Sequence, residues 1–282
     1  SYVLETDPGA GMPLIKTLSG TVSPVQVSAE ILKVLAARGK AAVGGEIEGV
    51  VITVPAYFDE AQRQATRDAA TLAGLKVLRL LSEPTAAAVA YGLDKKLEGT
   101  IVIYDLGGGT FDVSLMKLQR GVFEVLATGG NAALGGDDFD RAIVQWLLSQ
   151  AQLPAPEGAE YARLLRLART AKHALTSQSS TEISWQGWTG VLDQDTYFTL
   201  TDALIASSLL ACRRVLRDAG LETKDVTDVV MVGGATRPPR VQQKVSEFFG
   251  RTLLYRIDPE AVVAMGARLW AVVLAVHQVG DE

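Results

Sequence analysis

Three consecutive glycines between two carboxylates, in the segment YDLGGGTFD at residues 104–112, constrain the fold of this chain more than any other feature. The apolar run TIVIYDL leads into them and predicts a buried strand. Because glycine has no Cβ, Gly107, Gly108 and Gly109 let the backbone turn sharply with its N–H groups pointing outward. Backbone N–H groups gathered in such a turn bind anions, so the segment predicts a phosphate-binding turn.

The carboxylates beside this turn favour a divalent cation at the same place. Asp105 and Asp112 cannot by themselves attract a polyanion, whereas Mg²⁺ prefers carboxylate, water and phosphate oxygens. The pattern therefore indicates a nucleotide bound together with Mg²⁺. An ordinary hairpin is the alternative interpretation, since glycine-rich turns flanked by aspartates also connect paired strands.

Length and composition indicate a globular protein of two domains or lobes. The chain has 282 residues, of which 48% are hydrophobic and 21% charged, so a sizeable core is expected. A net charge of −5 lacks the basic footprint of a nucleic-acid binder, and we expect no nucleic-acid partner.

The small number of cysteines and histidines argues against a disulfide-stabilised secreted protein and against a zinc site. Cys212 is the only cysteine, so no internal disulfide can form, which fits a reducing cytoplasm. The chain has only two histidines, His173 and His277, and together with one cysteine they are too few ligands for a four-coordinate His/Cys zinc site. The apolar run 261–276 contains Arg268 and is short for a membrane span, so we expect a core helix and no membrane. No basic leader precedes an apolar segment, which gives no sign of secretion.

The first third of the chain alternates helical and strand patterns, which predicts a parallel βαβ layer. We expect a helix over 23–42, a strand in GVVITVPAYF, a helix opened by an Asp59–Gln62 capping box, a strand in LKVLRLLS and a helix in SEPTAAAVAYG capped by Ser82.

From Thr100 onward the pattern changes, and we expect a second lobe there. Three alternating runs predict an antiparallel meander with a turn at 119–121. The predicted elements that follow are helices over 137–150, 159–176 and 199–219, a β pair around Ile183 and Val191, the strand VTDVVMVGG, a helix after GATRPP and a closing helix. We therefore divide the chain into 1–99, a partial first lobe, 100–257, the second lobe, and 258–282, a helix returning to the first lobe.

A second glycine-rich strand end repeats the logic of the first. In VMVGGATRPP, Gly233 and Gly234 leave room for a close backbone approach, and Arg237 could stack its planar cation on a base. In LGGDDFD, Gly136 precedes a helix N-terminus, where anions bind. Together these turns favour a bound nucleotide. The alternative is that the glycines only form ordinary turns at the ends of strands and helices.

The chain resembles the DnaK-type heat-shock chaperone ATPases, which have an α/β actin-like fold with ribonuclease H-like lobes. The resemblance covers about four fifths of the chain. Its segments, in order, are TVPAYFDEAQRQATRDAATLAGL, SEPTAAAVAYGLD, YDLGGGTFDVS, LATGGNAALGGDDFD, VMVGGATRPP and DPEAVVAMGA. GVFEVLATGG and LLACRRVLRDAG look most like the HscA branch, which is specialised in iron–sulfur cluster assembly.

The resemblance implies ATP or ADP with Mg²⁺, and K⁺ as a further ion, and it implies roles for particular residues. Asp105 resembles the carboxylate that holds the Mg²⁺ water shell, and Asp112 a second one near the metal and monovalent ions. Glu83 resembles a catalytic carboxylate beside the attacking water, although a simple capping acid in the first turn of a helix is the alternative. Thr110 completes the loop around the β and γ phosphates.

The implied adenosine pocket lies in the second lobe. The residues that match it are Gly136, Lys172, His173, Thr176, Gly233, Gly234, Arg237 and Asp258. His173, Ala235 and Pro238 depart from the commoner residues of the family, so base affinity is expected to differ. Pro55 resembles a switch that couples the lobes, and Gly266 a part of the closing connection.

Two parts of the family pattern have no counterpart in this sequence. Family members begin with a DLGTT hairpin that holds the phosphates from the opposite side, and carry a lysine essential for hydrolysis soon afterwards. Lys16 and Lys33 lie in the wrong context to replace it. We therefore expect a fragment, or a missing part in another chain, with an incomplete first lobe, an exposed apolar face and very low turnover.

The implied partners belong to an intact chaperone. They are a J-domain cochaperone and an iron–sulfur scaffold protein, and no client-peptide domain is expected in this chain. ATP hydrolysis coupled to client release is the first functional hypothesis. A noncatalytic nucleotide- or partner-binding module is the second, and another actin-like phosphotransferase is the third, disfavoured by VPAYFDEAQRQATRDAATLAG.

Overall fold

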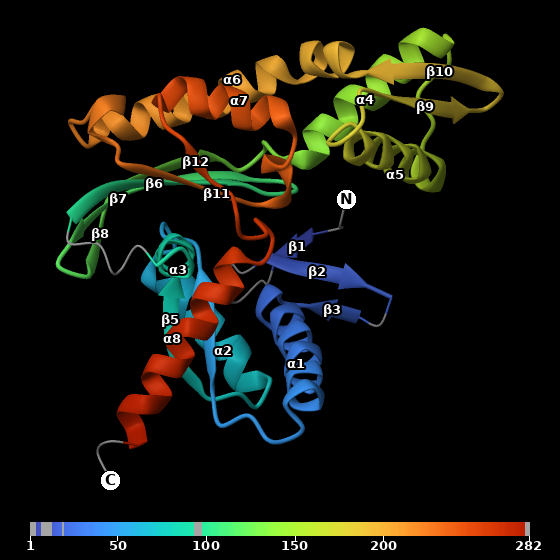
Figure 1. Cartoon of the computed structure of the whole chain (residues 1–282). Coiled ribbons are helices and arrows are strands. Elements are labelled where there is room, and N and C mark those ends of the chain that lie inside the picture. Colours follow the sequence, from blue (N-terminus) through green and yellow to red (C-terminus); the bar gives the residue numbers. More distant parts are fainter. Residues whose placement is uncertain (1–3, 7–12, 19, 93–97, 280–282) are drawn as a thin grey trace. The chain divides into compact units, whose positions relative to one another are not determined.

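The chain forms two compact units, each described separately (Figure 1). The structure is a computed structural model that describes residues 4–6, 13–18, 20–92 and 98–279. Unit 1 comprises Ser1–Ala86 and Ala267–Glu282, and unit 2 comprises Ala87–Gly266. The boundaries fall inside helices α3 (Glu83–Ala90) and α8 (Val262–Val279), not at the expected residues 99 and 257. The assignment of functional lobes stays a prediction.

Unit 1 contains short strands and two amphipathic helices. Its elements are β1 (Leu4–Thr6), β2 (Pro13–Thr17), β3 (Gly20–Val22), α1 (Pro24–Val43), β4 (Val50–Val54), α2 (Glu60–Leu72) and β5 (Val77–Ser82). Strands β1, β2 and β3 pair antiparallel, and β4 pairs with β5 in parallel. The predicted parallel βαβ layer is confirmed by β4, α2 and β5.

Side-chain caps fix where the helices of unit 1 begin. The Asp59 carboxylate accepts the Gln62 backbone N–H at 2.8 Å, and the Gln62 side chain accepts the Asp59 N–H at 3.0 Å. The predicted capping box is therefore confirmed. A second box that the sequence reading missed opens α1, where Ser23 and Gln26 make the same reciprocal bonds.

A five-stranded sheet forms the centre of unit 2, in the order β12-β11-β6-β7-β8. Its strands are β6 (Glu98–Leu106), β7 (Phe111–Gln119), β8 (Val122–Asn131), β11 (Asp228–Val232) and β12 (Leu253–Leu254). The predicted meander is confirmed, because β6, β7 and β8 pair antiparallel. Strand β11 runs parallel to β6, with Val232 opposite Asp105, so both strands end at the same edge.

Two apolar clusters attach the helices of unit 2. The helices are α4 (Gly136–Ala151), α5 (Gly158–Ala174), α6 (Gln194–Asp218) and α7 (Pro239–Phe249), with the hairpin β9 (Ser180–Trp185) and β10 (Trp188–Asp193). Side chains of α6 and α7 pack on one face of the sheet (Figure 1). A separate cluster joins α4, α5, β9, β10 and the start of α6.

Helix α6 begins five residues before its predicted start at Thr199. Asp193, the last residue of β10, accepts the Thr196 N–H at 2.8 Å and so caps the helix directly after the hairpin. The prediction was wrong here because the pattern 194–198 holds two aromatic residues and no long aliphatic one, which obscures the helical period.

The segment 261–276 was expected to form a buried core helix, and this expectation is wrong because several of its apolar side chains are exposed. Val262 is fully buried, but Met265 is 46% exposed and Val272 is 57% exposed. Its apolar residues occupy more than one side, and only one side packs in this chain. Helix α1 likewise exposes Ile31 and Leu35, and the expected uncovered face of the first-lobe sheet stays a prediction. Among the described residues, no helix combines the length and apolar character needed to cross a membrane.

Truncating the centre of the unit 2 sheet tests this core. Leu115 on β7 is fully buried, so we expect Leu115→Ala to lower the free energy of unfolding by about 2–5 kcal/mol. Val122→Ala, on the exposed side of edge strand β8, should change it by less than about 0.5 kcal/mol. Urea unfolding followed by circular dichroism measures both, and equal effects would contradict this placement of the core.

Candidate functional site

A pocket of about 590 Å³ lies within unit 2, between α4, α5 and the segment that follows β11. Its size falls in the range of small-molecule sites. The lining residues are Gly108, Gly136, Asp137, Arg169, Lys172, His173, Thr176, Gly234, Ala235, Arg237, Pro238 and Glu260. The pocket therefore gathers both glycine-rich strand ends with a set of charged side chains.

The triple glycine forms the turn between β6 and β7, as the predicted meander requires, and this turn is compatible with both the phosphate-binding and the ordinary-hairpin interpretation. Asp105 pairs with Asp112 across the two strands, and the Gly107 N–H donates to the Thr110 carbonyl at 3.0 Å. None of the three glycines has a positive φ. A Cβ on Gly108 or Gly109 would meet open space and one on Gly107 would make an ordinary contact at 3.6 Å, so neither lack of space nor a left-handed backbone requires glycine here, and phosphate binding stays a prediction.

The start of α4 is bonded directly to this turn. The N–H groups of Gly136 and Asp137 donate to the carbonyls of Gly107 and Gly108, at 2.9 and 2.7 Å. A Cβ on Gly135 would lie 2.5 Å from the backbone of Gly108. The expectation that the α4 N-terminus offers these N–H groups to an anion is therefore wrong, because the turn already uses them.

Helix α5 supplies one wall of the pocket with residues at helical spacing. Arg169, Lys172 and His173 belong to α5, and Thr176 lies in the turn that follows it. They are separated by three, one and three positions, so all four line the same pocket. Lys172 is buried, and its Nζ donates to the Gly136 carbonyl at 2.7 Å. Burial lowers the pKa of the Lys172 ammonium, and the hydrogen bond to Asp140 opposes that shift.

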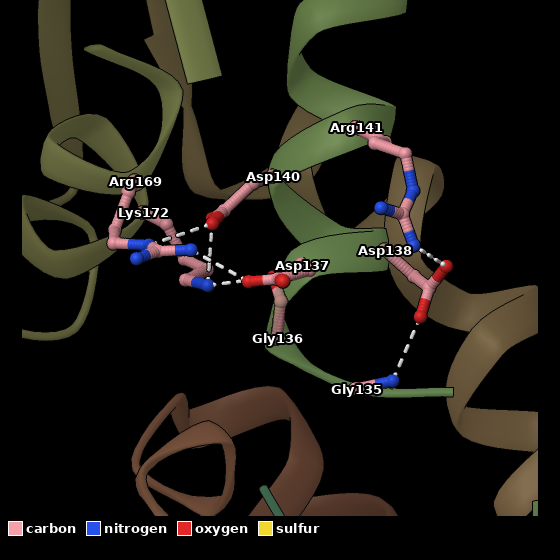
Figure 2. Close-up of polar contacts among 8 residues, drawn as sticks. All are labelled: Gly135, Gly136, Asp137, Asp138, Asp140, Arg141, Arg169 and Lys172. Carbon is pink, nitrogen blue, oxygen red and sulfur yellow. Dashed lines mark hydrogen bonds and ion pairs between the residues drawn. The ribbon is translucent and has the colours of Figure 1, made fainter. Parts of the chain in front are cut away.

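Two carboxylates of α4 hold the cations of this wall (Figure 2). Asp140 lies 2.6 Å from Lys172 Nζ, and its other oxygen accepts Arg169 Nε at 2.9 Å. Arg169 also donates to Asp137 at 2.6 Å. The guanidinium is half-exposed and lines the pocket, so its orientation is fixed by both aspartates.

The opposite wall follows β11. Gly234 lies close to Glu260, because a Cβ there would lie 2.7 Å from the Glu260 carboxylate and would displace it. Arg237 donates to Asp258 at 2.7 Å and to Glu260 at 2.9 Å. Gly233 has a φ of 87°, and a Cβ there would meet the Leu106 carbonyl at 2.3 Å, so the ends of β6 and β11 touch.

The two predicted metal carboxylates lie beside the turn. Partial burial raises the pKa of Asp112, and a hydrogen bond with the Thr110 side chain opposes the shift. In the described part of the chain, no group of three His, Cys, Asp or Glu side chains could hold a metal by itself. Two carboxylates next to the exposed Gly108–Thr110 backbone therefore fit a Mg²⁺ whose other ligands are water and phosphate oxygens.

The predicted site residues divide into those in the pocket and those elsewhere. Gly108, Gly136, Lys172, His173, Thr176, Gly234 and Arg237 line it. Gly107, Gly109, Thr110, Asp105 and Asp112 belong to the adjoining hairpin, Gly233 lies at its junction with β11, and Asp258 reaches the pocket through Arg237. Glu83 and Pro55 belong to unit 1, so their roles stay predictions.

Four residues of the site were missed by the sequence reading: Asp137, Asp140, Arg169 and Glu260. The helical period could have found Arg169, which lies three and seven residues before Lys172 and Thr176. Glu260 gave no such signal, because its place depends on the return of the chain after β12 to Gly234.

Comparison with known proteins settles the family. The family model described as Hsp70 protein matches residues 3–281. The chain belongs to the Hsp70 family. The predicted DnaK-type resemblance is thereby confirmed, and with it the actin-like α/β fold of the Hsp70 ATPase domain.

The similar relatives are HscA chaperones, as the predicted branch requires. "Chaperone protein HscA homolog" of Aeromonas salmonicida is 58% identical over 265 residues, and that of Azotobacter vinelandii is 59% identical over 265 residues. "Chaperone protein HscA" of Pectobacterium carotovorum is 57% identical over 265 residues. Each match covers 94% of this Hsp70 chain and 43% of the relative.

Gly135→Ala tests the contact between α4 and the glycine turn. The added methyl group would lie 2.5 Å from rigid backbone, so we expect a loss of about 1–3 kcal/mol in stability and faster amide exchange at residues 107–110. Gly45→Ala is the control, because that glycine has open space and no positive φ. Hydrogen exchange read by mass spectrometry compares them, and an unchanged turn in Gly135→Ala would refute the contact.

Proposed function

We propose that the unit 2 pocket binds an adenine nucleotide. The observation that carries the proposal is the parallel pairing of β6 and β11, which brings both glycine-rich strand ends and the cationic face of α5 around one pocket. Ligands of open α/β sheets bind beyond the carboxyl ends of such strands. The pocket volume also suits a ligand of nucleotide size.

The walls suggest how the ligand would be held. The glycine turn would face the phosphates, because its backbone is exposed. The side chains that would contact the nucleoside, as the family pattern implies, are those of Lys172, His173, Thr176 and Arg237. One terminal nitrogen of Arg237 donates to both Asp258 and Glu260, which restrains the planar guanidinium at the pocket wall and supports stacking on a base.

Mg²⁺ would be held through water by Asp105 and Asp112, and it would neutralise charge on the phosphates. Both carboxylates lie at the exposed turn of one hairpin. We extend the proposal to catalytic roles for Glu83 and Thr110 and to K⁺ near Asp112, as the family pattern implies.

For the whole protein we propose ATP hydrolysis coupled to client release in iron–sulfur cluster assembly. The support is the name shared by its relatives, which are HscA chaperones. A J-domain cochaperone and an iron–sulfur scaffold protein would be its partners, in a cytoplasmic setting. The chain spans about 43% of the length of these relatives, so these functions are proposed for the protein that contains it.

Calorimetry with ADP and Mg²⁺ tests the pocket without requiring chemistry. We expect weak ADP binding that is strengthened by Mg²⁺. Asp105→Asn should weaken ADP binding in the presence of Mg²⁺ by about tenfold, because one carboxylate that holds the metal becomes neutral. Asp195→Asn, an exposed carboxylate at the start of α6, is the control and should bind as the parent does. Failure of ADP to bind at any Mg²⁺ concentration would contradict the proposal.

Phosphate release separates the enzyme from a noncatalytic module. If the chain hydrolyses ATP, we expect slow release above background that Asp105→Asn lowers by about a hundredfold or more, because electrostatic stabilisation of the transferred group is lost. ADP binding together with identical, background-level release in both proteins would instead favour the noncatalytic module.

A further inference from the structure

Asp140 is a fully buried carboxylate that does not line the pocket, yet it contacts two cations that do. Its two oxygens divide between them, with Lys172 Nζ at 2.6 Å on one and Arg169 Nε at 2.9 Å on the other (Figure 2). The arrangement joins the interior of α4 to the α5 wall.

Stability alone gives a poor reason for a charge at this position. The residues one turn further along α4, Ile143 and Val144, are buried in an apolar cluster. Replacing a buried ion pair by apolar side chains is often neutral or stabilising, because desolvation offsets the attraction between the charges. A buried carboxylate that faces two pocket cations therefore points to a role in orienting them.

A chain of contacts leads from Asp140 to the glycine turn. Lys172 bonds Asp140 and also donates to the Gly136 carbonyl at 2.7 Å. The N–H of Gly136 in turn donates to the Gly107 carbonyl at 2.9 Å. The Gly136 carbonyl shares its peptide group with the Asp137 N–H, which donates to the Gly108 carbonyl at 2.7 Å, so this peptide links the Lys172 ammonium directly to the turn.

We propose that Asp140 is a positioning residue of the pocket, which holds Lys172 and Arg169 in the α5 wall and, through Lys172 and Gly136, fixes the glycine turn without touching the ligand. The inference rests on the proposed nucleotide function for its binding consequence. The link from Asp140 to the turn can be measured without any ligand.

The charge of Lys172 gives a readout that packing alone would not move. Burial lowers the pKa of this ammonium and Asp140 raises it, so Asp140→Asn should let Lys172 lose its proton at a lower pH. As the pH is raised, the affinity of the variant for ADP should therefore begin to fall at a lower pH than the affinity of the parent. The other ionisable groups facing Lys172 or its pocket are Asp137, Arg169, His173, Tyr197, Arg237 and Glu260.

The experiment compares Asp140→Asn with Asp202→Asn in the 282-residue chain. Asp202 makes a two-pronged ion pair with Arg240, at 2.8 and 2.6 Å, outside the pocket, so its variant controls for loss of an ion pair alone. In Asp140→Asn we expect about tenfold weaker ADP binding, an earlier alkaline loss of affinity and faster amide exchange at residues 107–110. Asp202→Asn should leave all three unchanged.

The outcomes separate this inference from the proposed function. Unchanged exchange at 107–110 in Asp140→Asn overturns the inference, as does faster exchange spread evenly over unit 2 or an affinity loss equal at every pH. Faster exchange confined to the turn, with no ADP binding by the parent, contradicts the proposed function and supports the positioning role.

A second variant covers the case in which Asp140→Asn fails to fold. Arg169→Gln removes one of the two cations from a half-exposed position and is expected to fold. It leaves the contacts from Asp140 through Lys172 to Gly136 in place, so it should weaken ADP binding less than Asp140→Asn would and leave exchange at the turn unchanged. Parent-like ADP binding would overturn the role of Asp140 in orienting Arg169, and faster exchange at the turn would overturn the route through Lys172.

Discussion

The parallel pairing of β6 with β11 is the constraint on which the rest of the site depends. It places Asp105 opposite Val232, so the glycine turn and the Gly233–Gly234 pair follow adjacent strands at one edge. Glycine is needed at the junction, since a Cβ on Gly233 would overlap the carbonyl of Leu106. Two segments about 120 residues apart in sequence thus form one surface because their strands share a register.

The second organising feature is the bond between α4 and the hairpin. A helix start normally leaves N–H groups unpaired, and here two of them bind the carbonyls of the glycine turn. The contact needs glycine at 135 on the helix side, because a Cβ there would lie 2.5 Å from the Gly108 backbone. The N–H groups of Gly136 and Asp137 are therefore bonded to the turn, and α4 could influence a ligand only through it.

Local sequence patterns predicted much of this fold, but they did not predict contacts between residues that lie far apart in the sequence. The meander, the parallel β4–β5 pair and the Asp59 cap follow from alternation, βαβ order and short-range hydrogen bonding, so the sequence contained them. The pocket residues named in advance came from the resemblance to the family. Asp140 and Glu260 escaped, because a buried partner or a returning segment has no periodicity of its own.

The ion pairs of the two walls have a consequence for which form of a phosphate ester could enter. Arg169, Lys172 and Arg237 are matched by Asp137, Asp140, Asp258 and Glu260, so three cations meet four carboxylates and the formal balance is −1. Such a lining has little surplus positive potential with which to attract a bare tetra-anion. It favours a phosphate ester whose negative charge is already partly neutralised by a bound cation.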